Sequence, residues 1–268
     1  MTSQTYLALA LAFYAVGAVH VLMHALTRRQ LLTSWTAVTT LGGFVLHTAS
    51  LTQRWTEAGH FPAIGLHDGT SLLAWASVLA FLMTYLRTRE EVLGLALYPA
   101  VFILVLIANL SAPTADRPEP ILRSVFLPVH TTLAVFGYAA LFLAAAMSVL
   151  YLIQERELKS RSPRAFYYMA PSLERCDTIS AGSASVGFGF LTLAIITGVL
   201  WSHAAHGHYW SWDAKGWSAL LAWIIYVALL VARYRTGWGG RRAALAGIAG
   251  FAAVVVTFVS ITFGTAGR

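Results

Sequence analysis

The chain contains little charge and almost no cysteine. Asp, Glu, Lys and Arg together make up 11% of its 268 residues, whereas hydrophobic residues make up 58%. This balance excludes a soluble domain with a single core, which could not bury so much apolar surface, and indicates a membrane protein in a lipid bilayer. Cys176 is the only cysteine, which excludes an intramolecular disulfide, a CxxC redox pair and a thiolate metal site.

The sequence also lacks the marks of a cleaved leader. No basic region precedes the first apolar run and no small-residue cleavage signal follows it, so we expect a retained membrane span. The formal net charge is +7, but the basic residues fall between apolar runs, where they set membrane topology. The charge therefore gives no reason to expect a nucleic-acid partner.

Long apolar runs make up most of the chain. Because each crossing needs about 20 apolar residues, the sequence predicts about eight transmembrane helices. Helices satisfy their own backbone polar groups in lipid, and no stretch alternates like a membrane β-barrel. Since most connections are short, we expect an all-α helical bundle and a single integral-membrane domain over residues 1–268. The expected spans are 5–26, 32–53, 67–86, 92–111, 128–152, 178–203, 217–234 and 243–263.

Basic residues are distributed unevenly between the two sides of this bundle. Alternation of the loops places about thirteen of the 18 Lys and Arg residues on one side, which the positive-inside rule makes cytoplasmic. We therefore expect a multi-pass protein of the cell membrane, inner or plasma membrane, with both termini on the outer side. The cytoplasmic set is Arg28, Arg29, Arg87, Arg89, Arg156, Lys159, Arg161, Arg164, Arg175, Arg233, Arg235, Arg241 and Arg242.

The polar interval at about residues 201–216, between the sixth and seventh apolar runs, is rich in aromatic residues and histidines. We call it the aromatic loop. Flat aromatic faces beside imidazoles suit a planar, largely apolar ligand that contains a metal ion, because rings bury area and imidazole nitrogens supply axial bonds. The loop therefore predicts a site for haem b, iron protoporphyrin IX, on the outer side. Its members include Trp201, His203, His206, His208, Tyr209, Trp210, Trp212 and Asp213.

Other histidines gather at the same expected surface. His60, His67 and His130 join those of the aromatic loop, and His47 lies deeper in the second span. Such a gathering fits bis-imidazole ligation of haem iron. His130 follows Pro128 at the outward start of the fifth span, a rigid position that can direct a side chain into an outer cavity. The alternative for His130 is an interfacial histidine bonded to a loop carbonyl. For His60 and His67 the alternative is that histidines in loops and at helix starts are commonplace.

Charged residues near the loop have more than one interpretation. Asp213 can hydrogen-bond a ligating histidine, cap the seventh helix at its N-terminus or pair with a basic residue. Arg54, Arg123 and Lys215 are expected on the outer side, where each can pair with an anionic haem propionate or remain a solvated loop charge.

The segment Tyr209-Trp-Ser-Trp-Asp-Ala-Lys215 resembles the WWD motif of the cytochrome c assembly proteins, the family that includes CcsA, CcmC and haem-lyase subunits. Further likeness to CcsA extends from about the second span to the end of the chain. It is carried by Arg54-Trp55 with Gly59-His-Phe-Pro62, by His130 with Tyr138-Ala-Ala, and by Gly187-Phe-Gly-Phe-Leu-Thr192.

This resemblance implies a membrane protein that receives haem and presents it at the outer, extracytoplasmic face. It further implies a CcsB-like or ResB-like membrane partner and covalent attachment of haem to the CxxCH cysteines of an apocytochrome c. Whether the chain itself catalyses that attachment, as the CcsA-type component of a haem lyase, is left open. The expected haem contacts are His60, His130, Trp201, His206, His208, Tyr209, Trp210, Trp212 and Asp213.

The chain departs from the family pattern at its iron ligands. CcsA proteins place a second outward histidine just past the last span, but residues 263–268 contain none, and Val231 occupies a further histidine position. His206 stands where the WWD string usually begins with tryptophan. We therefore expect the iron ligands to be His130 with either His206 or His208, or His130 alone.

Two other functions compete with haem delivery. One is a regulatory or structural membrane protein without synthase activity, similar to the short HemX and YpjD relatives. The other is a transporter that uses the outward histidines as a proton relay, which we disfavour because no acidic residue is expected to be buried in any span.

Overall fold

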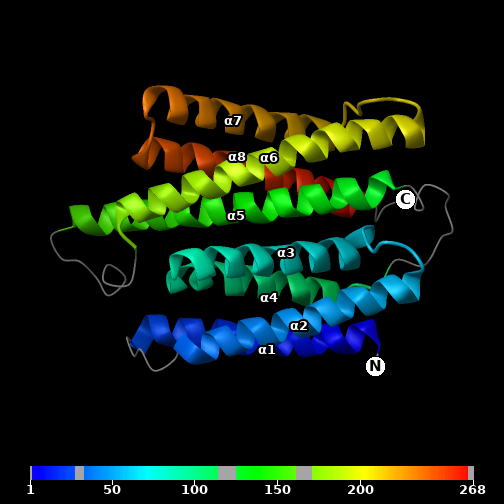
Figure 1. Cartoon of the computed structure of the whole chain (residues 1–268), viewed down its shortest axis with the longest axis horizontal. Helices are drawn as coiled ribbons and strands as arrows, with labels where there is room; N and C mark the ends of the chain where they lie inside the picture. The colour runs from blue at the N-terminus through cyan, green and yellow to red at the C-terminus, as the bar shows by residue number, and fades with distance from the viewer. Residues whose placement is uncertain (1, 28–32, 114–124, 161–170, 265–268) are drawn as a thin grey trace. The chain divides into compact units, whose positions relative to one another are not determined.

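The computed structural model describes residues 2–27, 33–113, 125–160 and 171–264, without the side chains of 24–27, 33–37, 91, 205–206 and 261–264. Within these ranges the secondary structure is helical throughout, which confirms the all-α prediction (Figure 1). A single 3-10 turn, η2 (Glu91–Leu93), precedes the fourth helix. The eight α-helices are α1 (Ser3–Thr27), α2 (Thr33–Ala58), α3 (Gly65–Thr88), α4 (Gly94–Leu110), α5 (Phe126–Lys159), α6 (Leu173–His206), α7 (Ala214–Thr236) and α8 (Gly240–Gly264).

Each expected span coincides with one helix. Six helices, all but α2 and α4, are long and apolar enough to cross a membrane. Helix α4 is apolar but has only 17 residues, and α2 turns several polar side chains inward, among them Thr40, His47 and Arg54. The structure does not determine on which side of a membrane the termini lie.

Residues at the helix ends explain where α6 begins and where α6 and α7 end. Ser172 precedes α6, and its hydroxyl accepts a hydrogen bond from the backbone N–H of Arg175 at 3.2 Å. Helices α6 and α7 both end at a glycine in the left-handed conformation, Gly207 with φ 76° and Gly237 with φ 67°. Glycine adopts this conformation without the steric cost that a Cβ atom imposes.

The chain folds into two compact units, Met1–Arg123 and Ser124–Arg268. We call them the N-terminal unit and the C-terminal unit and describe each by itself. In the N-terminal unit, α1 packs on α2 and α4, and α3 packs on α4 and α2. In the C-terminal unit, α5 packs on α6 and α8, and α7 packs on α8 and α6. The single domain expected over residues 1–268 stays a prediction.

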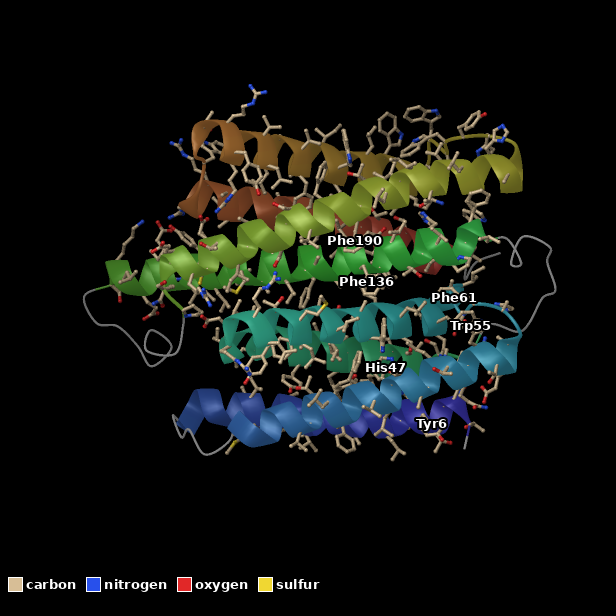
Figure 2. All side chains as sticks on the ribbon, viewed as in Figure 1. Tyr6, His47, Trp55, Phe61, Phe136 and Phe190 are labelled. Atoms are coloured by element: carbon tan, nitrogen blue, oxygen red, sulfur yellow. The ribbon has the colours of Figure 1, made fainter. Side chains whose placement is uncertain are left out.

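Close packing of α5 on α6 forms the core of the C-terminal unit. Phe136 and Phe190 lie against each other across this contact, with ring centroids 5.8 Å apart (Figure 2). Gly187 allows the approach, because a Cβ atom built there would lie 2.7 Å from the side chain of Leu141 and 3.0 Å from its backbone nitrogen. This contact fixes the register of the two helices that carry His130 and Trp201.

An ion pair joins three helices at the other end of the C-terminal unit. The Asp177 carboxylate of α6 accepts hydrogen bonds from Arg233 of α7, one of them 3.1 Å from Nη1, and from the backbone N–H of Gly240 in α8, also at 3.1 Å. Because the charges are partly buried, with side-chain exposures of 16% for Arg233 and 26% for Asp177, solvent screens them only in part. The Asp177–Arg233 ion pair orients the C-terminal end of α7. The N-terminal end of the same helix belongs to the aromatic loop.

The glycine contact between α5 and α6 can be tested by adding one methyl group. We expect Gly187→Ala to destabilise the folded chain by about 2 kcal/mol, because overpacking displaces Leu141 or separates the helices. Thermal unfolding of the purified protein in detergent measures the effect. Gly189→Ala, two residues along α6 with no heavy atom within 4 Å of the added carbon, is the matched control. Equal unfolding temperatures for the two variants would contradict the packing argument.

Candidate functional site

Two helix ends shape the aromatic loop. Helix α6 closes where the backbone N–H of Gly207 bonds to the carbonyl oxygen of His203 at 3.0 Å. Helix α7 opens at Asp213, whose Oδ1 accepts a hydrogen bond from the backbone N–H of Gly216 at 2.8 Å. The capping interpretation of Asp213 is therefore confirmed. The turn is tight at Gly216, because a Cβ atom there would lie 2.0 Å from the carbonyl oxygen of Ser211.

The tryptophans of the loop form a contiguous row that continues onto α7. The rings of Trp210 and Trp212 meet edge to face, with centroids 6.3 Å apart, and Trp212 contacts Trp217 at 4.9 Å. Trp212 is 67% exposed and Trp217 is 57% exposed, whereas Trp210 is half-buried. A row of exposed indoles is costly in water, so it is suited to contact an apolar ligand, a partner protein or lipid.

The indole N–H of Trp210 is buried and has no hydrogen-bond acceptor among the residues that the structure describes. Leaving a buried N–H unpaired costs about 1–3 kcal/mol, and such groups usually mark a place where water or a ligand completes the structure. The row of tryptophans therefore has one polar group available to a bound molecule beside its apolar faces.

His130 is held in a single orientation between α5 and α6. Its Nδ1 lies 2.8 Å from the carbonyl oxygen of Ala194, and because a carbonyl only accepts, Nδ1 carries the proton. Nε2 then keeps its lone pair, and it has no partner within the described part of the chain. A histidine that donates one ring N–H to a backbone carbonyl is the usual arrangement at metal sites.

Two residues of α6 complete the seat of the His130 imidazole. Trp201 lies nearly parallel to the imidazole, with an interplanar angle of 10° and centroids 6.2 Å apart. Gly198 provides the space, since a Cβ atom built there would lie 2.8 Å from Cε1 of His130. Lys215, in the first turn of α7, is near enough for its charge to act on this ring.

The remaining histidines of the loop are more open. His203 and Tyr209 are both exposed, and their ring centroids lie 4.0 Å apart. His208 is exposed, and its Nδ1 lies 3.4 Å from the hydroxyl of Ser202. The side chain of His206 lies outside the described residues.

His60 and His67 lie in the N-terminal unit. Nδ1 of His60 bonds to the carbonyl oxygen of Phe61 at 3.1 Å. His67 is 3% exposed, and its Nδ1 donates to the carbonyl oxygen of Ala108 at 2.7 Å. The structure thus brings together His130, Trp201 and the aromatic loop, while His60 and His67 belong to a separate unit.

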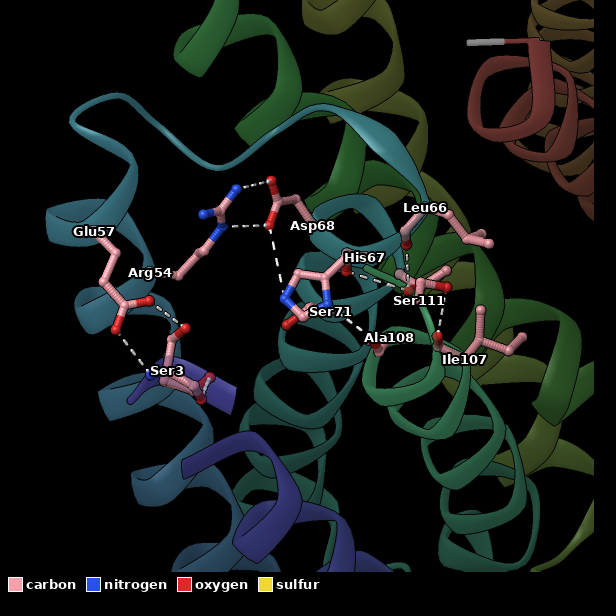
Figure 3. A network of polar contacts seen from close by, with 12 residues as sticks. Ser3, Arg54, Glu57, Leu66, His67, Asp68, Ser71, Ile107, Ala108 and Ser111 are labelled. Carbon is pink, nitrogen blue, oxygen red and sulfur yellow. Dashed lines mark hydrogen bonds and ion pairs between the residues drawn. The ribbon is translucent and has the colours of Figure 1, made fainter. Parts of the chain in front are cut away.

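Arg54 is engaged inside the N-terminal unit rather than held ready for a propionate. Its Nε lies 3.2 Å from Oδ1 of Asp68, and both side chains are buried (Figure 3). Asp68 lies in the first turn of α3 and is 2% exposed, so the premise that no acidic residue is buried in a span is wrong. Because Asp68 is neutralised by Arg54, its burial alone does not favour transport. Arg123 lies outside the described residues.

No group of three or more His, Cys, Asp or Glu side chains that could hold a bare metal ion occurs among the described residues. Haem makes a smaller demand on the protein, because the porphyrin supplies four nitrogen ligands and the chain needs only one or two axial ligands. The site therefore fits a metalloporphyrin better than a free metal ion.

Reading the sequence missed the residues that seat the ligand candidates. Gly198 and Gly216 leave space that a larger side chain would fill, and Ala194 supplies only a backbone carbonyl oxygen. In the N-terminal unit, the buried Asp68 was missed because its burial depends on its ion pair with Arg54. Trp217 could have been recognised from the sequence, since it follows Asp213 by one helical turn and extends the row of tryptophans.

Comparison with known proteins assigns the family. The family described as Cytochrome C assembly protein matches residues 68–266, from the start of α3 to the end of the described chain and beyond. The chain belongs to the cytochrome c assembly protein family. It is therefore a multi-pass membrane protein of cytochrome c biogenesis.

Several relatives of this cytochrome c assembly protein bear the name Cytochrome c biogenesis protein CcsA. The protein from Prochlorococcus marinus (strain MIT 9303) is 32% identical over 255 residues, covering 84% of this chain and 80% of the relative. The protein from Synechococcus sp. (strain CC9605) is 31% identical over 280 residues, covering 95% and 88% respectively. These matches support the CcsA-like resemblance along most of the chain.

A solved structure shares the fold. Cytochrome c Heme Lyase CcmF superposes with a TM-score of 0.71 and 18% sequence identity over 98% of this chain. The chain spans 47% of that protein, about half its length. At this identity the likeness establishes the fold alone.

The capping role of Asp213 can be separated from a role of its charge. We expect Asp213→Ala to destabilise the chain by about 1 kcal/mol, because Gly216 loses its side-chain acceptor. Asp213→Asn keeps an oxygen at the cap and should stay close to the unaltered protein in thermal unfolding. If Asp213→Asn were as destabilising as Asp213→Ala, the carboxylate charge and not the cap would be the important feature.

Proposed function

We propose that this protein binds haem b at the aromatic loop of the C-terminal unit and presents it for covalent attachment to an apocytochrome c. The observation that carries the proposal is the state of His130. Its Nδ1–H is bound to the carbonyl oxygen of Ala194, which leaves the Nε2 lone pair for iron. Membership of the cytochrome c assembly protein family supports a haem-handling role.

The residues around His130 fit a porphyrin. Trp201 offers a flat face beside the imidazole, and Trp210 and Trp212 offer apolar area and one buried N–H donor. Lys215, exposed in the first turn of α7 directly after the tryptophans of the loop, is our candidate cation for a propionate. Haem supplies the iron and the vinyl groups for attachment, while the chain binds and orients the macrocycle.

We propose that the second axial ligand, where the iron has one, comes from the aromatic loop. His208 is the described candidate, since Ser202 already contacts its Nδ1. His206 is its alternative, and ligation by His130 alone is the third possibility. Tyr209 and Asp213 then act as supports of the loop, and the expected haem contact from His60 stays a prediction.

The loop faces the extracytoplasmic side in this proposal. The excess of Lys and Arg on the opposite loops supports that orientation and puts both termini outside. A CcsB-like or ResB-like membrane protein is the expected partner, and the CxxCH segment of an apocytochrome c is the expected acceptor. The alternative of a HemX-like or YpjD-like regulator shares the haem site but lacks this partner, and co-purification distinguishes the two.

Haem content of variants tests the site. We expect His130→Ala to lose the Soret absorbance of the purified protein, because iron loses its oriented nitrogen. Gly198→Ala should lower haem affinity by about tenfold, because the added carbon displaces the imidazole and weakens the bond to Ala194. Gly182→Ala, on the same helix with no heavy atom within 4 Å of the added carbon, should retain full content. Full haem content in His130→Ala would refute the proposed ligand.

A further inference from the structure

Helix α2 carries a buried polar stripe that haem binding does not use. Thr40, His47 and Arg54 are seven residues apart, so they lie on one face of the helix. Their exposures are 1%, 0% and 7%. At 1.5 Å per residue the stripe runs about 21 Å along the helix, a large part of the roughly 30 Å hydrocarbon core. Ionisable groups inside a membrane bundle are costly and usually serve a function.

His47 lies at the middle of this stripe (Figure 2). It bonds to hydroxyl groups on two neighbouring helices. Its Nε2 lies 3.0 Å from the hydroxyl oxygen of Ser71 in α3, and its Nδ1 lies 3.4 Å from the phenol oxygen of Tyr14 in α1. A hydroxyl can donate or accept. Both imidazole tautomers therefore fit the same heavy-atom positions, provided that the two hydroxyl protons reorient together.

Two other histidines, buried His67 and half-buried His130, lack this freedom. Nδ1 of His67 and Nδ1 of His130 each face a backbone carbonyl, which only accepts, so each ring is fixed as one tautomer. One fixed bond is sufficient to join two helices. The two hydroxyls at His47 allow the ring to exchange between its tautomers, which is not needed to hold two helices together.

We propose that His47 is a proton relay between the hydroxyls of Ser71 and Tyr14, an activity separate from haem binding. The Ser71 hydroxyl gives its proton to Nε2 and takes a replacement from the α2–α3 connection side, while Nδ1 gives its proton to the oxygen of Tyr14. Tyr14 releases its own proton toward the side of Tyr98 and Thr40, so both hydroxyls are neutral again. The ring is neutral before and after, and it ends as the other tautomer. No oxidant or reductant is needed, because only protons move.

Polar groups extend the relay toward both ends of the N-terminal unit. Toward the α2–α3 connection, His67 lies one helical turn before Ser71 in α3, and its Nε2 lies 3.9 Å from Oδ1 of Asp68 (Figure 3). In the other direction, the ring of Tyr98 in α4 packs against Gly17, three residues after Tyr14 in α1, and its phenol is hydrogen-bonded to Thr40. Among the described residues, the hydroxyls that face His47 come from α1 (Tyr14) and α3 (Ser71), and the charged pair of Arg54 with Asp68 begins seven residues along α2.

Nitrogen-15 NMR of the full chain, labelled at histidine and reconstituted in lipid bilayers, tests the relay. Comparison with His47→Gln assigns the His47 signals. We expect Nδ1 and Nε2 of His47 to exchange between protonated and unprotonated states, while Nδ1 of His130 stays protonated. Tyr14→Phe removes one hydroxyl and should slow the exchange by about tenfold or more.

The control is Thr52→Val, which removes a hydroxyl bonded to the backbone of its own helix on the exposed face of α2; it should leave the exchange unchanged. If Tyr14→Phe does not fold, Ser71→Ala removes the partner on the other side of the ring. A single fixed tautomer of His47 in the unaltered protein would overturn the relay. Exchange that persists at the same rate in the folded hydroxyl variant would do the same and leave His47 a purely structural residue.

Discussion

The bond from Nδ1 of His130 to the carbonyl oxygen of Ala194 is the interaction on which the candidate site depends. It joins α5 to α6, fixes the tautomer of the ring and leaves Nε2 as the available nitrogen. The bond exists because Gly198 leaves room for the imidazole and because Gly187 lets the same two helices approach closely further along. Small residues at helix contacts thus determine the chemistry of a side chain on the neighbouring helix.

The two units hold a histidine in different ways, His130 by a backbone carbonyl and His47 by two hydroxyls. In the C-terminal unit a carbonyl fixes His130 as one tautomer, and we propose that the remaining nitrogen binds iron. In the N-terminal unit two hydroxyls leave His47 free to exchange protons. The difference follows from the hydrogen-bonding capacity of the partners, because a carbonyl only accepts whereas a hydroxyl donates or accepts.

Much of the fold was predictable from the sequence because membrane spans follow from apolar run length. The position of the aromatic loop was predictable because its tryptophans and histidines stand together in one short polar interval between two apolar runs. The burial of Asp68 was not, since it depends on Arg54, fourteen residues earlier, reaching it across the α2–α3 connection. The role of Gly198 could not be predicted either, because it depends on which residue of α5 faces this glycine. Relations between helices, and not propensities within them, account for both failures.

Helix α6 has 34 residues, so at 1.5 Å per residue it is a rod of about 51 Å, which exceeds a hydrocarbon layer of roughly 30 Å. The excess length lets its end, with Trp201 and the turn that follows, stand clear of the lipid tails. If the loop binds haem as we propose, an unfolded polypeptide arriving from water would meet that cargo in the headgroup layer without entering the bilayer.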